Sequence, residues 1–296
     1  MPTLTIFTPT YNRAYILPVL YESLQGQKCQ DFEWLIVDDG STDDTETLVR
    51  DWIADSRNNG LNIRYHYQPN GGKHRAINQG VQLAQGELFF IVDSDDYLLP
   101  EAVSFLLTWW NEVKNDTRYA GVCGLRCYPD KTSIGNIPSY ATYLDTDSLS
   151  FRTRYHEKGD KAEAFRTTVL RAYPFPEFDN EHFVTEAVVW NRIAQRYILR
   201  YYNQNIYCCD YLADGLTRSI ARHHFQSPQG TALYYSELAH WPQTDRWNRM
   251  KAAVNYWRYS TGNKQSFDVK CRQIGWENIF FLPLGMIFRL RDKIHR

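Results

Sequence analysis

The chain has 296 residues, of which 43% are hydrophobic, 15% aromatic and 23% charged, and its 33 Lys and Arg nearly balance 34 Asp and Glu. A net charge of −1 argues against a general nucleic-acid binder, which normally carries a basic excess. The aromatic content excludes an intrinsically disordered chain, and the length allows one large domain or two smaller ones.

The sequence indicates a cytoplasmic protein. Its first residues, MPTLTIFTPTYNR, lack the basic and apolar regions of a secretory signal. The longest apolar run, 279–288, contains Pro283 and Gly285 and is too short to cross a bilayer. Scattered cysteines in a long chain predict reduced thiols: Cys29, Cys123, Cys127, Cys208, Cys209 and Cys271.

Four short strand-like runs begin about 30 residues apart, which is the length of a strand–helix–strand repeat. They cover 4–7, 32–37, 63–67 and 88–92, and segments with a helical spacing of apolar residues separate them. This alternation predicts a mostly parallel sheet with helices on both faces. Ligands bind such sheets at the carboxyl ends of the strands, so we expect the functional side chains in the loops that follow them.

The second half of the chain is less regular. We expect a strand, a helix and an extended aromatic segment over 119–125, 185–197 and 198–210. Beyond Gly215 the pattern turns helical again. We therefore predict a domain boundary there, with residues 216–296 forming a C-terminal helical extension.

The strongest functional signal is Asp93-Ser94-Asp95-Asp96, which directly follows the apolar run 88–92. Neighbouring carboxylates repel one another unless a cation neutralises them, and in extended chain Asp93 and Asp95 share a face. Carboxylate oxygens suit Mg²⁺ or Mn²⁺. The alternative is that Asp95 or Asp96 caps a helix that begins near Pro100.

Asp38 and Asp39 lie at the end of the second strand, where carboxylates can hydrogen-bond a base or a ribose. Ser41 and Asp44 have the spacing of a helix capping box, which would leave the two strand-end carboxylates unexplained. A phosphatase of the haloacid dehalogenase type needs two Asp, two residues apart, after its first strand. This strand end lacks that spacing.

Two further loops carry binding chemistry. Gly71-Gly72-Lys73-His74-Arg75 opens a helix, and paired glycines with helix-start amides and cations form an anion site, although an ordinary glycine-rich turn would look similar. Thr8-Pro9-Thr10-Tyr11-Asn12-Arg13 follows the first strand. Its aromatic ring and cation suit a nucleobase.

Taken together, the four loops resemble the nucleotide-binding half of the family 2 glycosyltransferases in order and spacing. The matching motifs are TPTYNR, VDDGSTDD, NGGKHRAINQG and VDSDD. The resemblance covers residues 3–110 and continues weakly to 215. It implies a GT-A, Rossmann-like catalytic domain over 1–215, with a nucleotide-sugar-binding half (1–110) and an acceptor half (111–215).

The resemblance implies an inverting, metal-dependent transferase. It would move a sugar from a nucleotide-diphosphate sugar, of the UDP type, to a hydroxyl of a glycan or lipid-linked acceptor in polysaccharide biosynthesis. The implied ligands of Mn²⁺ or Mg²⁺ are Asp93, Asp95 and Asp96. The implied donor-binding residues are Pro9, Thr10, Tyr11, Arg13, Asp38, Asp39, Lys73, Arg75, Asp93 and Ser94.

For the general base the resemblance points to Glu186, just before an aromatic and Arg-bearing helix. With Thr185 as cap, Glu186 would lie in the first helical turn, where the helix field keeps a carboxylate ionised. Asp179 and Glu181 are its rivals. The segment 211–217 resembles a loop that closes over the donor or borders the acceptor.

The tail combines an apolar stretch, 276–288, with a basic one, 289–296. That combination suits peripheral contact with an anionic membrane at its inner face, and a terminal helix docked on the core would look similar. The functional alternatives are a sugar-phosphate nucleotidyltransferase, which normally opens with a longer glycine-rich basic loop, and a non-catalytic sugar-nucleotide-binding protein. We expect no nucleic-acid partner.

Overall fold

The computed structural model describes residues 2–137, 142–155, 159–209 and 216–294. These residues fall into two compact units. The first comprises Met1–Pro174 and Arg192–Leu212, and the second comprises Phe175–Asn191 and Ala213–Arg296. The segment that contains the predicted base, Glu186, thus groups with the C-terminal helices, whereas the sequence-based division falls after residue 215.

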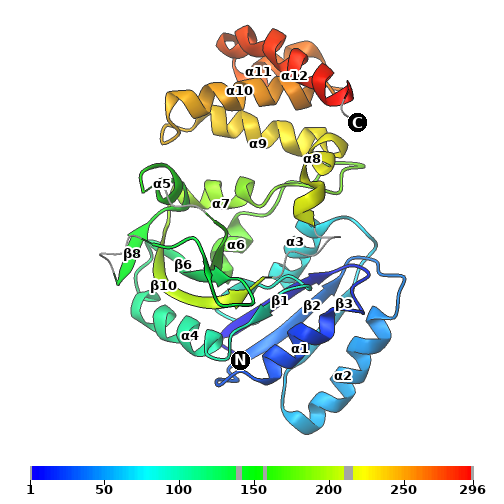
Figure 1. Cartoon of the computed structure of the whole chain (residues 1–296), viewed down its shortest axis with the longest axis vertical. Helices are drawn as coiled ribbons and strands as arrows, with labels where there is room; N and C mark the ends of the chain where they lie inside the picture. The colour runs from blue at the N-terminus through cyan, green and yellow to red at the C-terminus, as the bar shows by residue number, and fades with distance from the viewer. Residues whose placement is uncertain (1, 138–141, 156–158, 210–215, 295–296) are drawn as a thin grey trace. The chain divides into compact units, whose positions relative to one another are not determined.

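The first unit is built on one large β-sheet (Figure 1). Its strands are β1 (Leu4–Thr10), β2 (Phe32–Asp38), β3 (Ile63–Tyr67), β4 (Leu88–Ile91), β5 (Tyr97–Leu98), β6 (Tyr119–Cys127), β7 (Ser133–Ile134), β8 (Tyr143–Thr146), β9 (Lys161–Arg166) and β10 (Ile198–Cys208). The order is β3-β2-β1-β4-β9-β6-β10-β5, with β7 beside β6 and β8 beside β10.

Strands β1 to β4 are parallel, as the spacing of the apolar runs predicts. Thr10 pairs with Asp38, and Asp38 pairs with Tyr67, so the ends of β1, β2 and β3 lie in register. The carboxyl ends therefore share one edge of the sheet. Strand β9 is antiparallel to both β4 and β6, and no periodicity in the sequence predicts it.

Helices cover both faces of this sheet, which confirms the predicted α/β fold. The helices of the first unit are α1 (Leu17–Gln25), α2 (Thr45–Asn59), α3 (Lys73–Leu83), α4 (Ala102–Val113), α5 (Ser148–Thr153) and α6 (Thr167–Ala172), and the division between the units falls within α7 (Ala187–Ala194). Helices α1, α2 and α4 share a hydrophobic core with Ile6 and Trp34. Helix α3 packs on the opposite face, where a Cβ on Gly80 would lie 2.1 Å from the Phe7 ring.

The second unit is helical beyond residue 215, as its sequence predicts. Its elements are α8 (Leu216–Gln226), α9 (Pro228–His240), α10 (Arg246–Ser260), α11 (Phe267–Ile274), the 3-10 helix η1 (Trp276–Phe281) and α12 (Leu282–Ile294). It has its own core, in which Ala232, Ala253 and Tyr256 are fully buried. No helix among the described residues combines the length and the hydropathy needed to span a membrane. All six cysteines are described and are free thiols.

Candidate functional site

The loops after β1 and β2 are joined by hydrogen bonds. The N–H of Asn12 donates to Ser41 Oγ at 2.8 Å, and Asn12 Oδ1 accepts from the N–H of Thr42 at 2.7 Å. Asn12 has a left-handed φ of 53°, which asparagine tolerates better than most residues. Gly40 has a φ of 87°, and a Cβ there would lie 2.7 Å from the backbone N of Asn70. The two loops thus form a single rim at the carboxyl edge of the sheet.

Asp39 connects the end of β2 to the glycine-rich loop. Its carboxylate accepts hydrogen bonds from Gln68 Nε2 at 2.7 Å and from the N–H groups of Gly71 and Gly72 at 3.0 and 2.7 Å. Its own N–H donates to the carbonyl of Thr10 at 2.8 Å. Asp39 is buried, so its carboxylate shapes the loop from which α3 starts.

Asp38, the last residue of β2, is also fully buried and stabilises the same rim. Its carboxylate accepts from the N–H of Ser41 at 2.8 Å and from the Tyr65 hydroxyl at 2.7 Å. Both oxygens therefore have protein partners. Asp38 contributes to the site through the shape of the β2–α2 turn.

The capping box expected from Ser41 and Asp44 is wrong. The Ser41 hydroxyl accepts from Asn12 in the neighbouring loop, and α2 begins later, at Thr45. Asp43 instead accepts from the N–H and the hydroxyl of Thr45, at 3.1 and 2.6 Å. Contacts between two loops determine the role of Ser41, and local spacing does not reveal them.

The end of β1 offers an unsatisfied polar group. Pro9 and Thr10 are buried, whereas Tyr11 is 49% exposed. Thr10 Oγ1 finds no hydrogen-bond partner among the described residues. An orphaned buried hydroxyl costs about 1–3 kcal/mol, a cost that a bound ligand or water removes. The positive charge of Arg13 acts on Asp95, which brings this loop electrostatically to the acidic cluster.

The acidic cluster is held by side chains from three elements. Lys73, at the start of α3, forms a 2.6 Å ion pair with Asp93. The Tyr207 hydroxyl accepts from the N–H of Asp93 at 3.0 Å and donates to Asp96 Oδ2 at 2.6 Å. The Arg126 guanidinium lies over the Tyr207 ring, 4.3 Å from its centroid, and 4.0 Å from Asp96.

Tyr207 and Arg126 contact the acidic cluster, and the sequence did not indicate either residue. They lie on β10 and β6, and Tyr207 is 111 positions from Asp96. No motif surrounds either residue. The only available signal was their place near the carboxyl ends of two predicted extended segments.

The three carboxylates differ in their electrostatic environment. Burial raises the pKa of Asp93, but the charges of Lys73 and Arg126 outweigh burial and leave the pKa below its usual value. Burial and the charge of Asp93 raise the pKa of Asp95, and the same causes raise the pKa of Asp96 to about 7. The cations of the protein thus stabilise the ionised form of Asp93, whereas Asp95 and Asp96 ionise less readily than free carboxylates.

The alternative role of this cluster as a helix cap is wrong. Strand β5 follows Asp96 directly, and α4 has Glu101 as its N-cap residue, without a capping side chain. Neither Asp95 nor Asp96 adjoins a helix start. The carboxylates are therefore free of a local secondary-structure role that would explain their presence.

The carboxylates of the cluster fit a divalent cation whose coordination shell is completed by a bound ligand. The described residues contain no group of three or more His, Cys, Asp or Glu arranged around one point. Mg²⁺ is commonly bound through one or two carboxylates together with substrate phosphates. Asp93 and Asp95 can supply that share of a coordination shell, and the raised pKa of Asp95 marks charge that a cation would stabilise.

The remaining predicted donor residues lie in the glycine-rich loop at the start of α3 and within the acidic cluster itself. Gly72, with a φ of 96°, precedes α3, and Lys73 is its first residue. A Cβ on Gly71 would lie 2.7 Å from Arg75 Cδ, so the glycine allows the arginine to pack closely on the loop. Ser94 is buried between the carboxylates. Part of the loop over 211–217, namely 211–215, lies outside the described residues.

Glu186, the predicted base, directly precedes α7. Its carbonyl accepts from the N–H of Trp190 at 3.1 Å, which is the first helical hydrogen bond. The sequence predicts Thr185 as the cap and Glu186 within the first helical turn, whereas α7 begins at Ala187 and Glu186 lies directly before the helix.

The rival Glu181 has a structural role. It is buried, and its two carboxylate oxygens accept from the N–H groups of Gln229 and Gly230 at 2.7 and 2.9 Å, at the start of α9. Asp179, the other rival, is exposed. Since Glu181 is occupied in capping a helix, Glu186 remains the better placed of the two glutamates.

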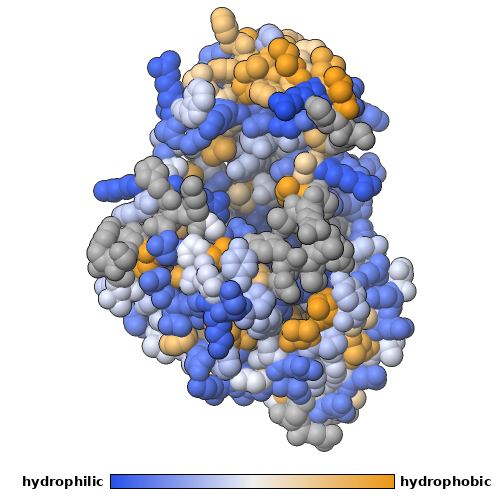
Figure 2. All heavy atoms as spheres, viewed as in Figure 1, coloured by the Kyte–Doolittle hydropathy of each residue, from blue (hydrophilic) through white to orange (hydrophobic). Residues whose placement is uncertain are grey.

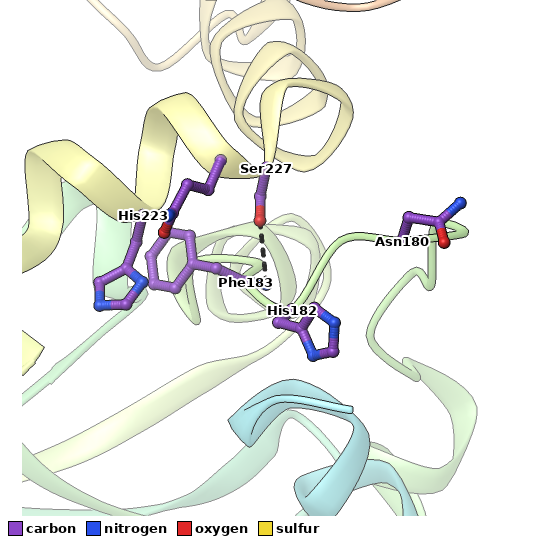
Figure 3. Close-up of a pocket in the computed structure, with 6 residues that line it drawn as sticks. Asn180, His182, Phe183, His223 and Ser227 are labelled. Carbon is purple, nitrogen blue, oxygen red and sulfur yellow. Dashed lines mark hydrogen bonds between the residues drawn. The ribbon is translucent and has the colours of Figure 1, made fainter. Parts of the chain in front are cut away.

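A pocket of about 360 Å³ lies in the second unit, between the segment that leads to Glu186 and helix α8 (Figure 3). Its lining residues are Asn180, His182, Phe183, His223, Gln226 and Ser227. The N–H of Phe183 donates to Ser227 Oγ at 3.1 Å, and its ring stacks on His223. The pocket is thus lined by polar side chains, and hydrogen bonding and ring stacking hold Phe183 in its wall.

Comparison with known proteins identifies relatives of this chain. The family model "Glycosyl transferase family 2" matches residues 5–176, more than half of the chain. The GalNAc(5)-diNAcBac-PP-undecaprenol beta-1,3-glucosyltransferase of Campylobacter jejuni is 31% identical over 192 residues, 64% of this chain and 59% of that enzyme. Chondroitin synthase of Pasteurella multocida is 36% identical over 183 residues, 61% of this chain and 17% of that protein. The matched region is less than two thirds of the length of these relatives.

Solved structures resemble the chain over nearly its whole length. TarS 1-349 of S. aureus in complex with UDP-GlcNAc has a TM-score of 0.61 at 17% identity, covering 98% of this chain and 92% of that one. The mannosyltransferase PcManGT of Pyrobaculum calidifontis in complex with GDP-Man and Mn²⁺ has a TM-score of 0.52 at 17% identity, covering 97% and 73%. At this identity the likeness concerns the fold.

Proposed function

Because the chain belongs to glycosyl transferase family 2 and has the GT-A fold, we propose that it transfers a sugar from a nucleotide-diphosphate sugar to an acceptor hydroxyl. The observation that carries the proposal is the acidic cluster at the end of β4. Lys73 and Arg126 surround it with positive charge, and it follows a strand whose carboxyl end shares an edge with β1 and β2. Carboxylates that can hold a metal cation, next to basic side chains that can bind phosphate oxygens, suit a diphosphate bound together with a cation.

We propose that the donor carries UDP. The related TarS structure contains UDP-GlcNAc, which supports this choice of nucleotide. In this chain the exposed Tyr11 ring and the orphaned Thr10 hydroxyl supply a stacking surface and a hydrogen-bonding group for a base. Asp38 and Asp39 act by holding the two loops in place.

A divalent cation would be held by Asp93 and Asp95, with Asp96 beside them. When bound, it supplies positive charge that stabilises the leaving diphosphate. The complex of PcManGT with Mn²⁺ supports a cation of this type. Lys73, which pairs with Asp93 in this structure, would instead bind a phosphate oxygen of the donor once the cation occupies the carboxylates.

The chemical step needs no covalent intermediate with the protein. The acceptor oxygen forms a bond to the anomeric carbon while the bond from that carbon to the diphosphate oxygen breaks, and the leaving group keeps the electron pair. Glu186 accepts the proton of the acceptor hydroxyl. A positioned general base contributes about 10²- to 10⁴-fold to such a step.

For the acceptor we propose a glycan or lipid-linked glycan. The C. jejuni relative carries an undecaprenol-linked substrate in its name, and the P. multocida relative is a polysaccharide synthase, which supports this class. The transfer would then be a step of polysaccharide or surface-glycan synthesis.

A thermal-shift screen of UDP-, GDP- and dTDP-sugars, with Mn²⁺, Mg²⁺ or EDTA, tests the proposed function. A ligand that binds only the folded state raises its apparent stability. We expect one UDP-sugar to raise Tm when Mn²⁺ is present, with little effect in EDTA. Asp95→Asn should weaken this shift, whereas Asp179→Asn, an exposed carboxylate of the second unit, should leave it unchanged.

Release of UDP from the same donor gives the second readout. Hydrolysis or transfer that requires Mn²⁺ supports the enzyme, whereas binding without turnover under every acceptor condition would indicate a sugar-nucleotide-binding protein. Absence of any nucleotide-sugar shift would contradict the proposal.

A further inference from the structure

Helix α12 packs on the second unit through an unusual face. Gly285 is its buried residue, and a Cβ there would lie 2.5 Å from the Cβ of Trp257. Asp292 forms a bidentate ion pair with Arg258 of α10, with both distances 2.7 Å. Arg289 lies over the Phe225 ring, 4.7 Å from its centroid. Leu282 at the start of the helix packs on the core of the second unit, and beyond it the inward face consists of a glycine and charged side chains.

The outward face of the same helix is apolar. Exposed large hydrophobic side chains run along η1 and α12, and Figure 2 shows hydrophobic surface gathered over this part of the molecule. Their exposed fractions are Trp276 54%, Phe280 88%, Leu284 44%, Met286 49%, Ile287 59%, Phe288 37%, Leu290 57% and Ile294 80%. A helix that only covers a core has the reverse pattern, with its apolar stripe inward.

The charges around this surface have one sign. Arg291 and Lys293 are exposed on α12 and make no ion pair with any described residue. Asp292, the acid of the helix, is neutralised by Arg258 on the inward side. An apolar face bordered by free cations, with a tryptophan at its start, has the composition of helices that lie in the headgroup region of a bilayer.

We infer that η1 and α12 form a docking surface for an anionic lipid bilayer, with the helix lying in the plane of the membrane. The apolar side chains enter the boundary between headgroups and acyl chains, and Arg291 and Lys293 contact lipid phosphates. A second copy of the chain fits this face less well, because a two-fold contact places the same patch on both partners and brings the cations together. This inference concerns the second unit and does not depend on the proposed transfer reaction.

Co-sedimentation of the full chain with lipid vesicles tests the inference. We expect binding to vesicles that contain phosphatidylglycerol, and at least about ten-fold weaker binding to phosphatidylcholine alone, because attraction to anionic headgroups adds to apolar burial. High salt should weaken the binding only in part. Ile287→Asp should reduce binding at least about ten-fold, because it places a charge on the apolar face.

The matched control is Val19→Asp, the same kind of change at an exposed position of α1. It should bind vesicles like the unmodified chain. Circular dichroism and thermal unfolding should be unchanged in both variants, since both side chains are exposed. Equal vesicle binding by Ile287→Asp and the unmodified chain would overturn the inference. Failure of the unmodified chain to bind anionic vesicles would also overturn it. If such a chain formed a dimer that Ile287→Asp dissociated, the face would be a contact between two copies of the chain.

Discussion

The carboxylates of this chain have their roles assigned by their hydrogen-bond partners. Asp39 accepts from two backbone N–H groups of the glycine loop, and Glu181 accepts from two at a helix start. Their oxygens are already satisfied by the protein. Asp95, in contrast, keeps a raised pKa through burial and the charge of Asp93. A carboxylate of this second kind is the one that gains most from a bound cation.

At the residue scale, Glu186→Gln tests the proposed base. The amide keeps the shape of the side chain but cannot accept the acceptor proton, so we expect the turnover number for transfer to fall by about 10²- to 10⁴-fold. Donor binding, measured by thermal shift with Mn²⁺, should be unchanged. Steady-state kinetics with a defined acceptor checks this.

Asp179→Asn is the control for that experiment, since Asp179 is an exposed carboxylate of the same segment. It should retain normal turnover. If Asp179→Asn lost activity and Glu186→Gln did not, the base would have to be reassigned to Asp179.

At the scale of elements, loops and helix ends depend on contacts between distant segments. The loop after β1 is attached to the loop after β2, and the loop after β2 is attached to the glycine loop after β3. In the second unit, the segment before α7 supplies the cap of α9. The elements themselves follow from local patterns, whereas their mutual placement depends on a few polar side chains.

The α9 cap gives a stability prediction. Glu181→Ala leaves two helix-start N–H groups without their buried acceptor, so we expect the free energy of unfolding to fall by about 1–3 kcal/mol. Urea unfolding followed by circular dichroism measures this. Asp179→Ala should change stability by less than about 0.5 kcal/mol, because its side chain is exposed. Equal stability of both variants would show that the cap contributes nothing.

At the scale of the whole molecule, the near-neutral net charge results from opposite excesses. Residues 1–110 hold 7 Lys and Arg against 15 Asp and Glu, and residues 111–296 hold 26 against 19. The acidic excess includes the cluster at the end of β4. The basic excess includes the free cations of α12. Each compact unit also has its own buried core, so a perturbation in one unit can be measured separately.

The second unit should lose stability in mild acid. Burial and then the charges of His223 and Arg258 lower the pKa of His224 to about 4. The unfolded chain binds a proton at this histidine below about pH 6.5, whereas the folded chain does so only near pH 4. The free energy of unfolding therefore falls as the pH falls from about 6.5 to about 4. The upper limit of this loss is about 3 kcal/mol, and the loss is smaller here because the ring is only partly buried.

Urea unfolding of the unmodified chain and of His224→Gln between pH 7 and pH 4.5 checks this. The difference in stability between the two proteins should shrink or reverse in favour of the variant as the pH falls. His66→Gln, on β3, provides the matched substitution in the other unit. A pH-independent difference for His224→Gln would contradict the assigned role of the buried ring.

The sequence by itself determined the architecture of the donor-binding half. Short apolar runs at regular spacing predicted β1 to β4, and the geometry of a parallel sheet then placed their following loops at one edge. The cluster Asp93, Asp95 and Asp96 was visible for the same reason, because its residues are adjacent in the chain. Membership of the glycosyltransferase family followed from the same four loops.

Only the tertiary structure decided what each polar group contacts. Arg126 and Tyr207 meet Asp96 of the acidic cluster from positions 30 and 111 residues away in the chain. Ser41 bonds a neighbouring loop instead of capping the helix that follows it. The face that α12 turns inward also depends on packing, because Gly285 allows close approach to Trp257 and Arg258 needs an acidic partner. Periodicity reports which residues share a face, and only the packed chain determines which face is buried.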